Sequence, residues 1–126
     1  MPYKIMMSVA ALVPLLFLIA FVAIPEFFVL QWYPSAEGLA LEIAITHRYD
    51  MAGILFMVVC FAFLSRNVEG VDNQKAILLG AAIAFSAMCA VIISIALFRC
   101  IPLDIPPMIA TGTLSALSFW SRSKLS

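Results

Sequence analysis

The sequence predicts an all-α protein: an integral membrane bundle of four transmembrane helices, with the N- and C-termini both on the cytoplasmic side. The composition, four long apolar segments and the distribution of basic residues predict this fold class. Of the 126 residues, 65% are hydrophobic and 11% are charged, whereas a soluble domain carries roughly 45–50% apolar and about 25% charged residues. So few charged side chains cannot cover a water-facing surface, and we therefore expect lipid to be the solvent of this chain.

The four apolar segments approach or meet the length that a membrane crossing requires. A hydrocarbon core about 30 Å thick needs roughly 20 residues of helix, because each residue rises about 1.5 Å. We expect one domain over residues 1–126, with helices at about 5–30, 47–65, 75–99 and 105–121.

The first segment begins after Lys4, as a secretory signal would. Its apolar run is about twice as long as the core of a usual signal, and no small-residue cleavage site closes it, so we expect a retained transmembrane helix. Pro14 should bend this helix, and Pro25 should mark its exit into the headgroups. Trp32 and Tyr33 follow and suit the aromatic belt at the membrane surface.

The second segment is centred on an apolar run from Met51 to Leu64. This run is long enough to span if the helix starts near His47 and the Arg48 side chain reaches back to the interface. Before it, apolar residues alternate with smaller or polar ones between Pro34 and Thr46. A lone strand would leave its backbone groups without partners, so we expect a short interfacial helix or an extension of the second helix.

The third and fourth segments carry small residues at helical spacing, which allow two helix backbones to approach closely. In the third segment we expect the side with the small residues to face the bundle, and the fourth has a small-x-x-x-small pair. The predicted helix-packing residues are Gly80, Ala84, Ala87, Gly112 and Ala116.

The charged residues predict the orientation of the bundle. With four crossings, five basic residues and two acidic ones fall on one side, and two basic and five acidic residues fall on the other. The positive-inside rule then places both termini and the middle loop in the cytoplasm.

Six ionisable residues of the outer side form the candidate ligand-binding site. Charges at membrane depth are costly unless paired, so we expect Arg48 to pair with Glu26 or Asp50, and Arg99 with Asp104. One interpretation is a polar pocket for a head group or small substrate, and the other is that these residues only cap and anchor helix ends. The candidate residues are Arg48, His47, Glu26, Asp50, Arg99 and Asp104.

The sequence predicts no catalytic residue, no metal site and no cofactor. Cys60, Cys89 and Cys100 occur singly, so neither a dithiol redox site nor a cysteine zinc site is indicated. His47 is the single histidine, so two-histidine haem ligation within the chain is excluded. The net charge is zero, which gives no basic surface for nucleic acid. The sequence does not decide whether the chain binds a lipid, a quinone or a pigment.

The segment His47–Gly53 places an arginine at the start of the second helix and a small-residue turn after it. With a four-helix form and a proline that closes the first helix, the chain resembles the DoxX-like group of small bacterial membrane proteins. The resemblance covers most of the chain and implies the four-helix architecture. It carries no catalytic residue to this sequence.

Three functional hypotheses follow. The first is a non-catalytic accessory subunit that packs against partner subunits of a larger membrane complex, such as an energy-converting one. The second is a DoxX-like protein that binds a quinone or lipid at the outer leaflet near Arg48. The third is a small proton-coupled exporter that works as a homodimer and uses Glu26. For all three we expect a bacterial inner membrane, with an organelle membrane as the alternative.

Overall fold

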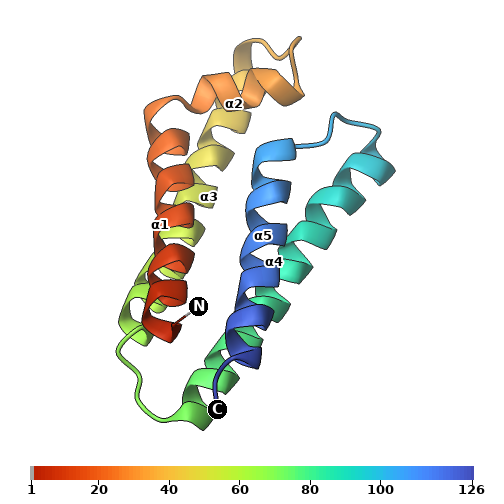
Figure 1. The fold of residues 1–126 in the computed structure, drawn as a ribbon. Coiled ribbons are helices and arrows are strands. Elements are labelled where there is room, and N and C mark those ends of the chain that lie inside the picture. The colour runs from red at the N-terminus through yellow and green to blue at the C-terminus, as the bar shows by residue number, and fades with distance from the viewer. Residues whose placement is uncertain (1) are drawn as a thin grey trace.

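The structure is a computed structural model that describes residues 2–126, and over that range it consists of helices and their connections, without β-strands (Figure 1). The prediction of an all-α protein is confirmed. Three helices, α1, α3 and α4, are long and apolar enough to cross a membrane. The five helices are α1 (Tyr3–Ala23), α2 (Pro25–Trp32), α3 (Gly38–Ser65), α4 (Val71–Arg99) and α5 (Ile105–Ser123).

The predicted helix at about 5–30 is wrong in one respect, because it is two helices. Ile24 lies between α1 and α2 with a non-helical backbone, and Pro25 opens α2. Proline lacks a backbone N–H and suits the first turn of a helix, so a new helix begins there in a different direction. Pro14 lies inside α1 without ending it.

The predicted helix at about 47–65 is too short, because α3 begins at Gly38. Of the two alternatives for residues 34–46, the extension of the second helix is correct. Gly38 has a φ of +55°, a conformation that glycine adopts readily, and it turns the chain out of the preceding loop into α3. Helical hydrogen bonds then satisfy the backbone groups that a lone strand would leave unpaired. The other two helices begin or end within four residues of their predicted bounds.

The long helices form two hairpins, which Figure 1 shows side by side. In the first, α1 packs along α3, and α2 lies across their upper end. In the second, α4 packs along α5. The two hairpins meet chiefly through α1 and α5.

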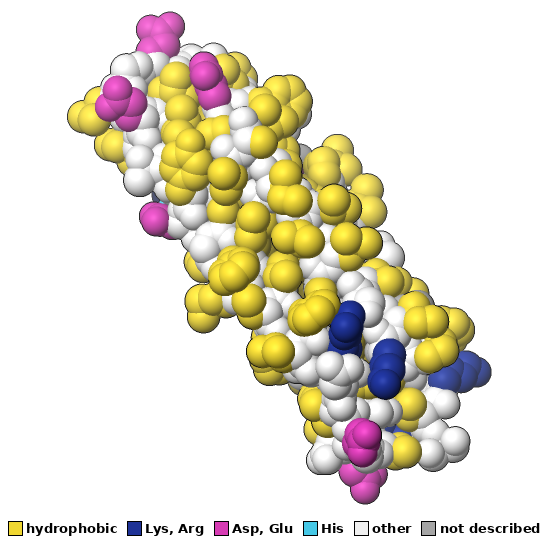
Figure 2. Space-filling model, turned by 90° about the vertical axis from the view of Figure 1, so that its left-hand side faces the viewer, with side chains coloured by type: hydrophobic (Ala, Val, Ile, Leu, Met, Phe, Trp, Pro, Cys, Tyr) yellow, Lys and Arg dark blue, Asp and Glu magenta, His cyan; other side chains and the backbone are white. Residues whose placement is uncertain are grey.

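The two ends of the molecule differ in charge. Both termini and the 66–70 connection lie at one end, whereas α2 and the 100–104 connection lie at the other (Figure 1). Figure 2 shows a broad hydrophobic surface between mostly acidic side chains toward one end and basic side chains toward the other. The basic end carries Lys4, Arg66, Lys75, Arg122 and Lys124 with Glu69 and Asp72; the acidic end carries Glu26, Glu37, Glu42, Asp50 and Asp104 with Arg48 and Arg99.

The main hydrophobic core lies toward the basic end, where the two hairpins meet. Side chains from α1, α3, α4 and α5 all contribute to it, and Met6 and Leu78 are fully buried. The hydroxyl of Tyr3 donates a hydrogen bond of 2.7 Å to the carbonyl oxygen of Ser65, which ties the start of α1 to the end of α3. The core residues are Tyr3, Met6, Met7, Ala10, Ala11, Ala62, Leu78 and Leu114.

The small residues of α4 do not face the bundle, contrary to the prediction. Gly80, Ala84 and Ala87 are exposed, and a Cβ atom added at Gly80 would meet nothing within 4 Å. The face toward α5 lies two positions further along, at Ala82 and Ser86. Two positions correspond to about 200° around a helix of 3.6 residues per turn, which is nearly the opposite side.

Hydroxyl groups link α4 to α5 on that opposite face. The Ser86 and Ser115 hydroxyl oxygens are 2.6 Å apart, and Ser115 also donates to the carbonyl oxygen of Ala82 at 3.0 Å. Gly112 is half-buried, and a Cβ added there would lie 3.8 Å from the Cys89 Sγ atom, so this predicted packing residue does face a neighbouring helix. Its partner in the predicted pair, Ala116, is exposed.

Candidate functional site

Arg48 is the most deeply buried charged residue described at the acidic end, with 5% of its surface exposed. It lies on α3, one residue after His47, and points toward α1 and α2. Its guanidinium carbon is 5.4 Å from the centre of the Phe21 ring and 4.9 Å from that of Trp32. A cation at this distance from an aromatic face is attracted to it, more strongly where water is excluded.

The polar contacts of the guanidinium are long. One nitrogen donates to the carbonyl oxygen of Phe28 at 3.5 Å, and another approaches the Met51 sulfur at 3.7 Å. The first distance exceeds the usual range for an N–H···O hydrogen bond, and a thioether sulfur is a weak acceptor. The two aromatic rings therefore carry much of the stabilisation of this charge.

Asp104 immediately precedes α5, and 9% of its surface is exposed. Burial raises the pKa of its carboxyl group above the ordinary value, and this effect outweighs the influence of Arg48 and Trp32, which act to lower the pKa. We call Arg48, Asp104 and Trp32 the polar cluster.

This arrangement differs from the predicted one. Arg48 was expected to pair with Glu26 or Asp50, and Asp104 with Arg99, but Glu26, Asp50 and Arg99 are exposed, whereas Arg48 and Asp104 are both buried. The charge that influences the pKa of Asp104 is that of Arg48. These two residues are 56 positions apart in the sequence, which gives no local sign of this arrangement.

Trp32 and Phe21 are the residues of this site that the sequence did not indicate. Trp32 was assigned to an aromatic belt at the membrane surface, whereas it is half-buried and stacks over Arg48. Three edge-to-face ring contacts, from Phe17 through Phe21 and Phe28 to Phe27, continue the aromatic packing from α1 to α2. The phenylalanines on both sides of Pro25 were the feature of the sequence that could have indicated this aromatic packing.

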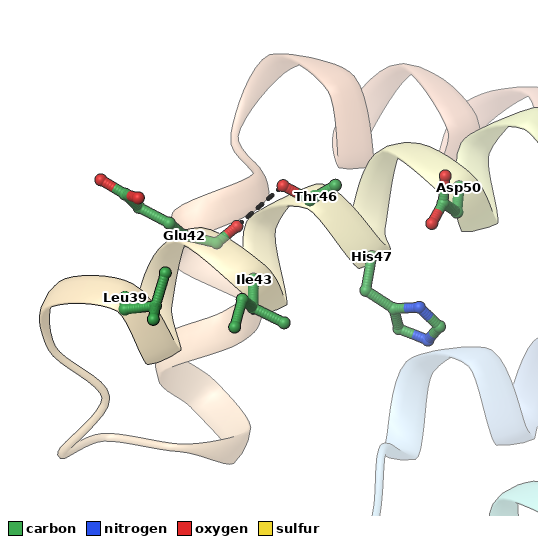
Figure 3. Close-up of a pocket in the computed structure, with 6 residues that line it drawn as sticks. All are labelled: Leu39, Glu42, Ile43, Thr46, His47 and Asp50. Carbon is green, nitrogen blue, oxygen red and sulfur yellow. Dashed lines mark hydrogen bonds between the residues drawn. The ribbon is translucent and has the colours of Figure 1, made fainter.

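His47 and Asp50 lie away from the polar cluster, on the exposed side of α3. They line a shallow groove of about 380 Å³ together with Leu39, Glu42, Ile43 and Thr46 (Figure 3). In Figure 3 all six side chains come from successive turns of this one helix. The hydroxyl of Thr46 donates to the Glu42 carbonyl oxygen at 2.9 Å, a contact within the helix.

The groove offers an open acidic face and no enclosed cavity. No other helix contributes a lining side chain. Among residues 2–126, no group of three or more histidine, cysteine, aspartate or glutamate side chains is placed to hold a metal ion. The six predicted site residues thus separate into two buried residues, Arg48 and Asp104, and four exposed ones.

The chain matches no protein-family model, no curated protein and no solved structure. Its resemblance to the DoxX-like group therefore stays a prediction. What the structure gives is an all-α chain with three candidate membrane spans, and hence a multi-pass membrane protein.

Proposed function

We propose that this chain crosses a bacterial inner membrane four times and serves as a non-catalytic subunit that packs against a larger membrane complex. α5 is the fourth crossing in this proposal. Its 19 residues extend about 28 Å, close to the thickness of a hydrocarbon core.

The distribution of side chains around α5 supports a membrane location. Three of the serines that lower its hydropathy point inward, since Ser115, Ser118 and Ser121 are buried. Ile105, Ile109 and Phe119 are among its exposed side chains. A helix of a soluble protein shows the reverse arrangement, with apolar residues inside and polar residues outside.

The charge difference between the two ends supports the orientation. The basic end, with five basic and two acidic residues, lies in the cytoplasm according to the positive-inside rule. Because both termini and the 66–70 connection lie at that end, an even number of crossings satisfies the rule.

The exposed small residues of α4 carry the functional proposal. The exposed surface of α3 consists largely of big side chains such as Phe56, Met57 and Leu64, which suit lipid. On α4, by contrast, Gly80, Ala84 and Ala87 form an exposed stripe at helical spacing. Small residues allow close approach of another helix, and the helices of this chain leave the stripe uncovered. A transmembrane helix of a partner subunit fits it.

Two glycines provide a matched test. Gly80 lies in the stripe of α4, and Gly53 lies among large exposed residues of α3; a Cβ atom added at either would meet nothing within 4 Å. Gly80→Ile and Gly53→Ile should therefore both fold. We expect the parent and Gly53→Ile to elute in a large assembly after extraction in mild detergent, and Gly80→Ile to elute as the free chain.

The size of the extracted species decides the outcome. Recovery of the parent only as a monomer or homodimer would contradict the accessory-subunit proposal. If Gly80→Ile eluted in the same large assembly as the parent, the stripe would not be the surface that contacts the partner subunit. Neither the quinone or lipid hypothesis nor the exporter hypothesis has a comparable observation in its favour, because Arg48 is enclosed by residues of its own chain and Glu26 is exposed at the start of α2.

A further inference from the structure

Lys4 and Arg66 are two cations of the basic end that lack an anionic partner within the described chain. Lys4 is exposed at the start of α1, and Arg66 is half-buried at the end of α3. Among residues 2–126, neither side chain donates a hydrogen bond or forms an ion pair, and the one contact of the Arg66 guanidinium is with an aromatic ring. Both cations are therefore free to bind an anion from outside the chain.

The packing of α1 along α3 brings these two cations to the same part of the molecule. The Tyr3 hydroxyl donates to the carbonyl oxygen of Ser65 at 2.7 Å. Lys4 and Arg66 directly follow these two bonded residues. Arg66 also follows the buried Ala62 by one helical turn, so it lies on the side of α3 that packs along α1.

The surface of the first hairpin shows where the charges lie relative to the apolar side chains. Figure 2 faces the side of the molecule that α1 and α3 form in Figure 1. Basic side chains gather there at the lower edge of the hydrophobic surface, and the acidic side chains of this end lie farther out. An anion at the edge of the hydrophobic surface therefore meets the basic side chains first.

The Phe63 ring orients the Arg66 guanidinium. The guanidinium carbon is 4.0 Å from the centre of this ring, a distance at which the cation is attracted to the aromatic face. A stacked guanidinium keeps the N–H groups at its edge available, and this planar fork matches the oxygen atoms of a phosphate group. Lys4 contributes a second positive charge from α1.

Both cations lie where an apolar helix surface ends. Ile5 follows Lys4 on α1, Phe63 and Leu64 precede Arg66 on α3, and these three apolar side chains are exposed. The 21 residues of α1 extend about 31 Å, which is close to the thickness of a hydrocarbon core. When α1 and α3 cross a membrane, the two cations therefore lie at the level of the lipid phosphates.

We propose that Lys4 and Arg66 form a binding site for the phosphate of an anionic phospholipid in the leaflet at the basic end. Arg66 donates hydrogen bonds to the phosphate, Lys4 adds charge, and the acyl chains lie on the exposed apolar side chains of the first hairpin. A zwitterionic lipid fits less well, because its ammonium group would lie near two cations. The site does not depend on the accessory-subunit proposal, since it requires only that α1 and α3 cross the membrane.

Native mass spectrometry of the full chain in neutral detergent tests the site, with phosphatidylglycerol and phosphatidylcholine as the added lipids. The parent should bind phosphatidylglycerol more tightly than phosphatidylcholine. Lys4→Gln combined with Arg66→Gln should weaken phosphatidylglycerol binding about 25-fold, because each basic residue near an anionic lipid contributes roughly a fivefold factor. Circular dichroism checks that the variant is folded.

Arg122→Gln combined with Lys124→Gln is the matched control, because it removes the same charge from exposed residues at the same end. It should weaken binding less than about twofold, since salt screens charges that do not contact the lipid. Should Arg66→Gln fail to fold, Lys4→Gln alone alters an exposed residue and should weaken binding about fivefold.

Three results would refute the site: equal binding of the two lipids by the parent, unchanged binding in the variants of Lys4 and Arg66, or an equal loss in the control. Glycerol 3-phosphate at the same concentration as the lipid separates a lipid from a free phosphate. It carries the phosphate without acyl chains and should leave the lipid bound. Displacement of the lipid by this compound would show that a soluble phosphate, and not a phospholipid, is the ligand.

Discussion

The basic end of the molecule is built around apolar side chains, whereas the acidic end buries charged ones. At the basic end the stabilisation is spread over side chains such as Met6, Met7 and Leu78, each of which is almost completely buried. At the acidic end Arg48 is buried against the Phe21 and Trp32 rings, and Asp104 is buried just before α5. A buried charge concentrates its stabilisation in a few contacts, so the acidic end should respond more strongly than the basic end to a single substitution.

The largest expected effect concerns the acidic end. Arg48→Ala should lower the free energy of unfolding by about 3 to 4 kcal/mol, because it removes a buried side chain together with its contacts to the Phe21 and Trp32 rings and leaves a cavity. Denaturation of the purified protein by SDS in mixed micelles, followed by circular dichroism, measures this change.

A second substitution provides the control for that measurement. Arg48→Met fills much of the same space with an unbranched side chain whose sulfur packs well against aromatic rings, so it should recover most of the lost stability. If Arg48→Met were as unstable as Arg48→Ala, the loss of packing against the rings would not be the cause.

A smaller effect is expected at the basic end. Leu78→Ala should cost about 2 to 4 kcal/mol, because it removes buried methyl groups and leaves a cavity among the core side chains. The same SDS titration measures it. Ile83→Ala on the same helix removes a side chain that is mostly exposed and should change the stability by less than about 0.5 kcal/mol. If Leu78→Ala and Ile83→Ala lowered the free energy of unfolding equally, Leu78 would not belong to the main hydrophobic core.

The smallest effect is a dependence of stability on pH. Burial raises the pKa of the Asp104 carboxyl, so the folded protein binds a proton there more readily than the unfolded one. By linkage the folded state gains stability as the pH falls through this raised pKa, and the gain is complete below the ordinary value of about 3.9.

Fluorescence of Trp32 measures this change. Trp120→Phe leaves Trp32 as the single tryptophan, and an SDS titration followed by its fluorescence should show a more stable protein at about pH 4 than at about pH 7. Asp104→Asn should abolish the pH dependence, and Glu26→Gln, which alters an exposed carboxylate on α2, should retain it. A response that survives in Asp104→Asn would assign the titration to another group.

Much of the architecture could be predicted from local features of the sequence. The apolar segments fixed the positions of the long helices, because a helix satisfies its own backbone groups and needs only apolar side chains to lie in lipid. Pro25 was identified as the end of the first span, although it also opens a separate helix. The start of α3 at Gly38 was harder to predict, because apolar alternation resembles a strand when its partners are unknown.

Which faces of the helices meet could not be predicted in the same way. Gly80, Ala84 and Ala87 have the spacing of a packing face, but so do Ala82, Ser86 and Cys89, and α5 packs against the second set. In lipid, both faces of such a helix are compatible with their surroundings, so hydropathy does not distinguish them. The hydrogen bonds of Ser115 decide the choice, and they exist only after α4 and α5 have come together.

The sequence by itself determined that this chain is helical and that several of its segments are long and apolar enough to cross a membrane. These properties follow from composition and from spacing along one segment. Only the tertiary structure decided that Arg48 is buried against the Phe21 and Trp32 rings. That arrangement joins three helices, and its energy depends on the exclusion of water, which arises when these helices pack together.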